Sequence, residues 1–202
     1  MINAYVVGDV LIDAGIRSYK KRILKSLQGH RIAAHALTHV HPDHQGASHE
    51  ICQTLNIPLW CSVDEVYAME SGDMSNQIPT HLITRFQNTF WTGAPHAVDK
   101  GLKEGDSVAD FEVIETPGHS PGHLSFWRER DRTLIVGDVA RNINFLTMQQ
   151  ELGNPPGMFT MDAARNRESM LKLAALNPKT LFFGHGKPIM DGQKFVDFVQ
   201  SL

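Results

Sequence analysis

Possible metal ligands are concentrated in one short run, Thr38-His39-Val40-His41-Pro42-Asp43-His44. Alternate residues of extended backbone point to the same side, so His39 and His41 can reach one cation. Beyond them the chain turns, and the turn can aim Asp43 and His44 at a second point close by. Imidazole nitrogens and carboxylate oxygens are common ligands of divalent cations in proteins. The run therefore predicts two adjacent metal positions served by one loop.

Three further candidates follow apolar runs that read as strands. They are His119 in Thr116-Pro117-Gly118-His119, Asp138 in Leu134-Ile135-Val136-Gly137-Asp138, and His185 in Leu181-Phe182-Phe183-Gly184-His185. Each polar residue is preceded by a glycine, which lets the backbone approach a neighbour closely because it has no Cβ atom. Together with the first run, these residues give five histidines and two aspartates, enough nitrogen and oxygen donors to fill two metal positions.

The elements that must position these residues mix strands and helices. Apolar periodicity predicts strands over 5–8, 10–13, 32–37, 57–61, 111–116, 123–128, 133–137 and 180–183. It predicts helices over 16–27, 45–55, 64–71 and 162–176, and a closing helix marked by Phe195, Val196, Val199 and Leu202. Two stretches, 72–98 and 141–159, read as irregular: each is a lid, a binding loop or a packed surface excursion. Strands precede helices in each half, which favours an α/β sandwich of two facing sheets with helices outside.

Composition limits the class of protein. The chain has 202 residues, of which 42% are hydrophobic and 20% charged, so we expect one globular domain over 1–202. A formal charge of −3 argues against a nucleic-acid partner, and no apolar run reaches the roughly 20 residues of a membrane span. The first residues do not resemble a signal peptide, so we expect a cytoplasmic location. Cys52 and Cys61 are expected as free thiols rather than as a disulfide or thiolate ligands.

The whole motif set resembles that of the metallo-β-lactamase superfamily, defined by the string H-x-H-x-D-H followed by separate His, Asp and His residues. The resemblance runs from Asn3-Ala4-Tyr5 and Leu11-Ile12-Asp13-Ala14-Gly15 to Phe183-Gly184-His185-Gly186. It implies the αββα four-layer sandwich of that family. It also implies the metal ligands: His39, His41 and His119 for a first ion, Asp43, His44 and His185 for a second, and Asp138 bridging the two. Asp13 matches a position that supports the site without binding metal.

The resemblance implies a hydrolase with two divalent ions, most simply Zn²⁺, although Fe or Mn suits the same donors. A metal-bridging hydroxide would attack a carbonyl or phosphoryl centre, and Asp43 would orient this nucleophile and accept a proton. The ligand set resembles that of glyoxalase II and the acyl-homoserine lactonases. Only about 17 residues follow His185, so the helical region with which glyoxalase II binds glutathione is not expected here. Enzymes that open β-lactams generally lack the bridging aspartate.

We therefore expect a small-molecule thioester, ester or lactone as the substrate. An iron-dependent oxidoreductase like the persulfide dioxygenases, with His39, His119 and Asp138 as ligands, is one alternative. A phosphodiester hydrolase using the same site is another, and a metal-degenerate binding protein is a third. The sequence does not determine the oligomeric state.

The substrate pocket and the remaining histidines are less specific signals. Several apolar side chains of the irregular stretches are candidates for lining a pocket over the metals, with core packing as the alternative: Phe86, Phe90, Trp91, Phe145, Met158 and Phe159. Five histidines outside the motifs are expected to be ordinary surface or core residues: His30, His35, His49, His81 and His96. His123 lies near His119 in the sequence and could support the site from behind.

Overall fold

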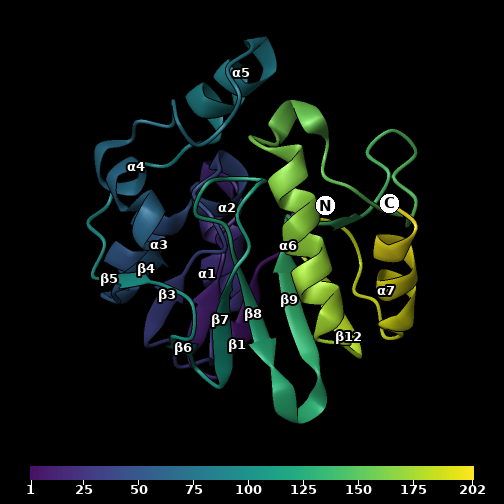
Figure 1. Cartoon of the computed structure of the whole chain (residues 1–202). Coiled ribbons are helices and arrows are strands. Elements are labelled where there is room, and N and C mark those ends of the chain that lie inside the picture. The colour runs from purple at the N-terminus through teal and green to yellow at the C-terminus, as the bar shows by residue number, and fades with distance from the viewer.

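The computed structural model describes residues 1–202, and most of its strands form two five-stranded sheets (Figure 1). The first sheet contains, in spatial order, β1 (Tyr5–Val7), β2 (Val10–Ile12), β3 (Ala34–Ala36), β4 (Leu59–Ser62) and β5 (Lys100–Leu102). The second contains β12 (Thr180–Phe183), β9 (Thr133–Gly137), β8 (Leu124–Arg128), β7 (Phe111–Glu115) and β6 (Ser107–Val108). Strands β2 to β5 run parallel, and β12 joins β9 in parallel, whereas the other neighbours are antiparallel. A short hairpin of β10 (Arg141–Asn142) and β11 (Leu152–Gly153) lies outside both sheets.

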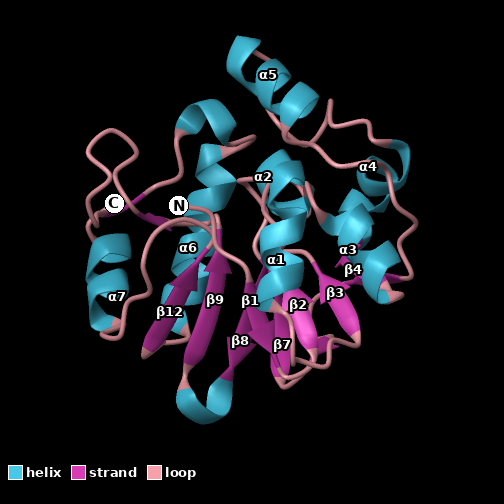
Figure 2. Ribbon diagram, turned by 180° about the vertical axis from the view of Figure 1, so that it is seen from behind, coloured by secondary structure: helices cyan, strands magenta, loops and turns pink.

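The two sheets face each other, and helices cover both outer faces. The inner layer is an apolar cluster with residues from both sheets, including Ile12, Ala36, Val113, Phe126 and Ile135. The helices α6 (Ala163–Ala175) and α7 (Gln193–Gln200) cover the second sheet (Figure 1). The first sheet is covered by α1 (Lys20–Ser26), α3 (Ser48–Leu55) and α4 (Val66–Ser71), seen from behind in Figure 2. This arrangement confirms the four-layer αββα sandwich.

Two of the expected helices differ in detail from the structure. The helix expected over 45–55 is divided into α2 (Pro42–Gln45) and α3, and the break falls at Gly46 and Ala47. A Cβ atom at Gly46 would lie 2.3 Å from the Trp91 carbonyl oxygen and 2.5 Å from the Arg17 nitrogen, so three segments cross there. The helix expected over 16–27 begins with a turn of 3-10 helix, η1 (Arg17–Tyr19). Similar short turns are η2 (Val63–Glu65), η3 (Glu129–Asp131) and η4 (Gly157–Phe159).

The expectation that 72–98 is irregular throughout is wrong, because this stretch contains α5 (Leu82–Phe90). Its start has a reciprocal capping box between His81 and Thr84. The Thr84 side chain accepts from the His81 backbone nitrogen at 3.0 Å, and the His81 side chain accepts from the Thr84 backbone nitrogen. The sequence contains an apolar stripe at helical spacing, Leu82, Phe86 and Phe90, but the Gly, Pro, Asn and Thr residues of this stretch favoured an irregular segment. In the structure this stripe lies on the exposed side of the helix. Leu82 is 82% exposed, and Thr84 is the one fully buried residue of the helix.

Several strands end at the same edge of the sandwich. The polar loops follow the carboxyl ends of β3, β9 and β12, as expected for parallel neighbours. The chain's first residues reach this edge too, since Ile2 pairs with His185 and the Asn3 nitrogen donates to the Gly184 carbonyl at 2.9 Å. Cys52 and Cys61 are buried free thiols, as predicted. No helix combines the length and apolarity that crossing a bilayer would require.

Candidate metal centre

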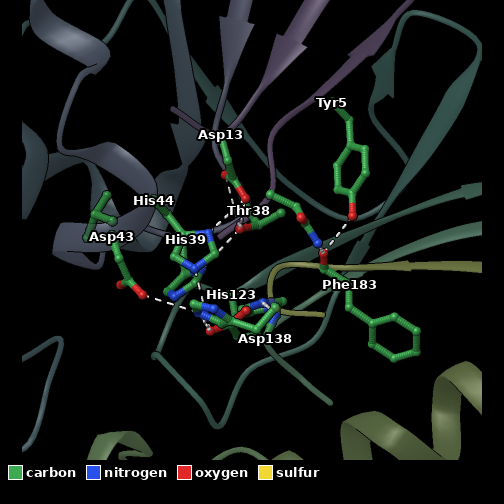
Figure 3. Close-up of polar contacts among 12 residues, drawn as sticks. Tyr5, Asp13, Thr38, His39, Asp43, His44, His123, Asp138 and Phe183 are labelled. Carbon is green, nitrogen blue, oxygen red and sulfur yellow. Dashed lines mark hydrogen bonds and ion pairs between the residues drawn. The ribbon is translucent and has the colours of Figure 1, made fainter. Parts of the chain in front are cut away.

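The seven predicted ligands meet at the edge where the strands end. Figure 3 labels His39, Asp43, His44 and Asp138 among them. The segment after β3 provides four of them, His39 and His41 from the loop and Asp43 and His44 from α2. The β7–β8 loop provides His119, Asp138 directly follows β9, and His185 lies two residues after the end of β12. Three overlapping groups have their ligand atoms within 4.8 Å of one another: His39–His41–His119, His39–His44–Asp138 and Asp43–His44–His185. Residues almost 150 positions apart in the sequence therefore share one polar cluster.

Asp138 occupies the centre of this cluster. Its Oδ2 atom lies 3.1 Å from His185 Nε2, 3.4 Å from His44 Nε2 and 3.6 Å from His119 Nε2. On the other side, His185 Nε2 is also 3.1 Å from Asp43 Oδ2. One carboxylate thus contacts histidines from both of the groups that the sequence assigned to separate ions.

Each histidine of the cluster is fixed through its second ring nitrogen. His44 Nδ1 lies 2.8 Å from Asp13 Oδ2, and His185 Nδ1 lies 3.0 Å from the Met1 carbonyl oxygen. The others contact Thr38 Oγ1 (His39 Nδ1, 3.0 Å), the Gln77 carbonyl oxygen (His41 Nε2, 2.7 Å) and Thr160 Oγ1 (His119 Nδ1, 3.3 Å). A carboxylate or carbonyl partner holds the ring proton on the outer nitrogen, which leaves the inner nitrogen with a free lone pair. The rings are oriented as metal ligands are.

Four of the inner atoms have no hydrogen-bond partner in the protein. Nε2 of His39, His44 and His119 and Oδ1 of Asp138 are buried without a hydrogen bond. Buried polar atoms are nearly always paired, so four unpaired atoms converging on one point call for a ligand that accepts their lone pairs. The donors are nitrogen and oxygen without a thiolate, which suits Zn, Fe or Mn. The residues therefore fit a His/Asp metal site of the dinuclear kind.

Burial and neighbouring charges shift the pKa values of the clustered histidines in two directions. Burial and the neighbouring histidines hold the pKa of His39 and His119 well below the ordinary value. Burial also acts to lower the pKa of His185, but Asp138 and Asp43 outweigh it and raise this pKa to about 10. The carboxylates raise the pKa of His44 in the same way. A bound cation therefore has to displace protons from the two histidines nearest the aspartates.

Glycines before the ligands allow this close approach, as the sequence predicted. A Cβ atom at Gly184 would lie 2.0 Å from Asp138 Oδ1 and 2.7 Å from His44 Cε1. Gly137 has a φ of +62°, and a Cβ atom there would lie 2.5 Å from His123 Nε2. Any side chain at these positions would push apart the residues that the centre brings together.

Asp13 supports the loop after β3 and is not itself among the groups that could hold a metal, in agreement with its expected place. Its Oδ1 accepts from the Thr38 nitrogen at 2.8 Å, and its Oδ2 contacts both Thr38 Oγ1, at 2.9 Å, and His44 Nδ1 (Figure 3). Through Thr38, which also contacts His39, this one carboxylate orients two histidines of the cluster.

Glu65 has an equivalent supporting place that sequence reasoning missed. Its carboxylate is completely buried and accepts from the Val40 nitrogen at 2.8 Å, from Ser120 Oγ at 2.5 Å and from the Gly122 nitrogen at 3.2 Å. It therefore joins the loop of His39 and His41 to the loop of His119. A signal was present in the sequence: Glu65 shares the buried face of its helix with Ala68 and Met69, where a charged residue is unusual.

The other histidines fall into two groups. His123 is buried, and its Nε2 lies 2.9 Å from the backbone nitrogen of Asp138, so it supports the centre from behind. His35 is a buried core residue that contacts Ser48 Oγ and the Leu11 carbonyl oxygen. The remaining four lie at or near the surface: His30, His49, His81 and His96. None of these joins the cluster.

A cavity of about 360 Å³ opens over the cluster. Trp91, Phe145 and Phe159 line it together with Ile78, Gln87, Pro155 and Pro156. The other three candidates for pocket residues, Phe86, Phe90 and Met158, are not in the lining. They are 56%, 60% and 44% exposed on the segments that border the cavity.

Comparison with known proteins agrees with this geometry. A family model described as the metallo-beta-lactamase superfamily matches residues 1–185. The Probable metallo-hydrolase YflN of Bacillus subtilis (strain 168) is 34% identical over 209 residues, which cover 92% of this chain and 78% of that protein. A hydroxyacylglutathione hydrolase of Bdellovibrio bacteriovorus is 30% identical over 156 residues, covering 75% of this chain and 48% of that protein.

A solved structure is also similar over almost the whole chain. The crystal structure of TTHA1623 in a di-iron-bound form superimposes with a TM-score of 0.70 at 27% sequence identity, covering 94% of this chain and 89% of that one.

Proposed function

The chain belongs to the metallo-β-lactamase superfamily and is a metallo-hydrolase of that family with a His/Asp metal site. From this premise we propose that it hydrolyses a small-molecule thioester, ester or lactone with two metal ions, in the first place Zn²⁺. The observation that supports two ions is the position of Asp138, whose Oδ2 lies within 3.6 Å of a histidine from each group.

The residues divide into two sets around this carboxylate. His39, His41 and His119 would hold one ion, and Asp43, His44 and His185 the other, with Asp138 between them. Bound divalent ions lower the pKa of a coordinated water to about 7 and polarise a carbonyl oxygen, which is the chemistry that ester and thioester hydrolysis needs. The donor set suits iron as well as zinc, and the relative TTHA1623 was solved in a di-iron-bound form.

Asp43 is placed to orient an attacking water. It borders the cavity, and one of its oxygens is held by His185 Nε2 at 3.1 Å. Burial acts to raise the pKa of Asp43, but the charges of His44 and His185 outweigh burial and lower it. The carboxylate is therefore ionised at neutral pH, and it would orient the attacking water by accepting a hydrogen bond from it.

The test combines elemental analysis with a substrate panel. The purified protein is stripped with a chelator, reloaded with Zn²⁺, Fe²⁺ or Mn²⁺, and assayed on a thioester, a lactone, a phosphodiester and a cephalosporin. We expect two ions per chain and hydrolysis of the thioester or the lactone only after reloading. Oxygen uptake with one iron per chain would contradict the proposal, and so would full hydrolysis by the stripped protein.

One variant of the cluster tests metal content and turnover together. Asp138→Ala should lower metal content and turnover together, because it removes the carboxylate common to both groups. Asp191→Ala is the matched control, since Asp191 is an exposed carboxylate outside the cluster. Full activity of Asp138→Ala would exclude the proposed centre.

A further inference from the structure

Exposed apolar side chains gather around the mouth of the metal cavity. Sixteen large hydrophobic residues of the chain are exposed, and nine of them lie in the two segments 77–98 and 142–161, which form about a fifth of the chain. In the first segment they are Leu82, Ile83, Phe86 and Phe90, and in the second Phe145, Leu146, Met148, Met158 and Met161. A concentration of this kind on a soluble surface marks a place where something apolar binds.

The same two segments contain almost no charge. Arg85 and Glu151 are their only Lys, Arg, Asp or Glu residues, whereas 41 such residues occur in the whole chain of 202. A surface without charges does not compensate the loss of hydration of an anionic or cationic ligand. The surface around the cavity is therefore suited to an uncharged, apolar ligand.

The exposed surface is continuous with the cavity wall. Ile83 and Gln87 of α5 and Trp91, the residue directly after this helix, follow each other at helical spacing, and Gln87 and Trp91 line the cavity. On the adjacent stripe of the same helix, the rings of Phe86 and Phe90 pack against each other at a tilt of 42°, with centroids 4.7 Å apart. α5 lies at the outer end of the molecule in both views (Figures 1 and 2).

A contact between the two segments closes one side of the mouth. His81 Nε2, at the start of α5, lies 2.7 Å from the Met158 carbonyl oxygen, and the His81 ring lies 5.9 Å from the ring of Phe159. On the other side, the Phe145 ring stands 5.5 Å from the His185 ring of the metal cluster. An apolar chain leaving the cluster would therefore contact aromatic residues of both segments.

The guanidinium of Arg141 in the cavity wall is hydrogen-bonded to other groups of the protein. Arg141 is the one Lys or Arg residue in the lining. Its guanidinium donates to the carbonyl oxygens of Ile143 and Asn154, and to Glu151 Oε1 at 3.3 Å. It holds the β10–β11 hairpin together and has little donor capacity left for a substrate carboxylate. The cavity consequently offers no Lys or Arg side chain that could bind an anionic group on the part of the substrate remote from the metals.

We propose that the substrate is an acyl thioester, ester or lactone with a long unbranched apolar chain, which lies between α5 and the segment 142–161 while its carbonyl carbon faces the metal cluster. This inference rests on the proposed hydrolase function and adds the class of acyl group. Hydrolysis breaks the carbonyl carbon–sulfur or carbon–oxygen bond, adds one water, and releases the fatty acid and a thiol or alcohol, or a hydroxy acid from a lactone.

The test is a chain-length series of thioesters of one neutral leaving group, N-acetylcysteamine, from two to twelve acyl carbons. For the metal-loaded protein we expect kcat/KM to rise by roughly threefold to fourfold per methylene over the first several methylenes, as burial of each adds to binding. If the acetyl or a polar acyl thioester is cleaved and the series is flat, the acyl-chain inference is overturned while the hydrolase function stands. If no member of the series, no lactone and no ester is cleaved, the proposed function itself fails.

Variants of the exposed surface separate chain binding from folding. Phe86→Ser combined with Phe90→Ser changes exposed residues only, and it should flatten the dependence of log kcat/KM on chain length. Met190→Ser alters an equally exposed residue outside the two segments and should leave this dependence unchanged. An unaltered slope in the double variant, or an equal change in Met190→Ser, contradicts the proposal.

A binding measurement on the metal-free protein gives an independent readout. Straight-chain 2-alkanones of five to thirteen carbons resemble the acyl thioester but cannot be hydrolysed. Titration with them should change the fluorescence of Trp91, with a dissociation constant that falls as the chain lengthens, and Trp91→Phe identifies the signal. Absence of binding overturns the inference. So does a dimer in light scattering that the Phe86 and Phe90 changes dissociate, because the exposed surface would then be covered by a second copy.

Discussion

The Nε2 atom of His123 accepts a hydrogen bond from the backbone nitrogen of Asp138 at 2.9 Å. Since Nε2 accepts, the ring proton lies on Nδ1, which contacts Thr116 Oγ1 at 2.8 Å. Thr116 in turn contacts Ser125 Oγ at 3.0 Å, and that hydroxyl donates to the Val136 carbonyl oxygen. A neutral, buried histidine thus fixes the backbone of the central aspartate, and burial lowers the pKa of His123 to about 3, which keeps it neutral.

Variants of His123 should distinguish the effect of its hydrogen-bond acceptor from that of the imidazole ring itself. His123→Ala leaves the buried Asp138 nitrogen without a partner and should lower the free energy of unfolding by about 3 kcal/mol. His123→Gln offers an amide oxygen near the position of Nε2 and should recover metal content and most of the stability. Urea unfolding and elemental analysis of both variants measure this. Equal losses in the two variants would show that the ring, and not its acceptor atom, is what the site requires.

Glu65 should affect metal affinity because it holds the loop of His39 and His41 close to the loop of His119. In Glu65→Gln one acceptor oxygen becomes an NH₂ group, so either the Val40 nitrogen or the Ser120 and Gly122 side loses its acceptor. We expect a loss of metal affinity of about 10- to 100-fold, the usual effect of removing a residue that orients ligands. Competition with a chelator measures the affinity, and the visible spectrum of the Co²⁺-loaded protein reports the altered geometry.

Glu168→Gln is the matched control for this measurement, because Glu168 is exposed on α6. An unchanged Co²⁺ spectrum and an unchanged affinity in Glu65→Gln would leave Glu65 with a role in the core alone.

The glycine before His185 should be intolerant of even a methyl group. Gly184→Ala places a Cβ atom within 2.0 Å of Asp138 Oδ1, so the carboxylate must move. We expect reduced metal content and a loss of stability of about 1–3 kcal/mol. Gly157→Ala is the control, because no atom lies within 4 Å of its Cβ position. Normal metal content in Gly184→Ala would mean that Asp138 is not held where the structure has it.

His35 should make the stability depend on pH. Burial lowers the pKa of His35 to about 4, against an ordinary value of 6.5. Below pH 6.5 the unfolded chain binds a proton that the folded chain refuses until about pH 4, so the stabilisation is complete above 6.5 and is lost as the pH falls through this window. By linkage, the loss between pH 8 and pH 5 is about 2 kcal/mol.

The check for His35 is urea unfolding of the metal-free protein at several pH values. His35→Gln cannot titrate, so its unfolding free energy should fall by about 2 kcal/mol less between pH 8 and pH 5 than that of the unchanged chain. Identical pH dependence in the two proteins would assign the effect to other groups.

The sequence was most informative where local spacing sets geometry. The positions of His39 and His41 on one loop, and the glycines before His119, Asp138 and His185, were sufficient to predict that these residues meet. The αββα architecture followed from the same motifs and from the resemblance they support. These features depend on backbone periodicity and on the size of single residues, which a sequence displays directly.

Partners chosen by tertiary contact could not be predicted in this way. The residues that orient the rings, such as Gln77 and Thr160, lie 36 and 41 positions from the histidines they contact. Helix α5 was missed although Leu82, Phe86 and Phe90 recur at a helical spacing, because the Gly, Pro, Asn and Thr residues of this stretch favoured an irregular segment. The exposure of its apolar side, which only the structure reveals, is the basis for the acyl-chain proposal.

The contacts of Met1 and Asn3 with the end of β12 have a consequence for how the protein matures. Asn3 Nδ2 donates to the carbonyl oxygens of Phe183 and Gly186, 180 and 183 positions later, and the Met1 carbonyl holds His185. A nascent chain still short of residue 186 can have neither contact, however well its earlier strands have formed. The metal centre is accordingly completed late in biogenesis. Ribosome-bound intermediates expose His39, His41, Asp43 and His44 before His185 has been synthesised.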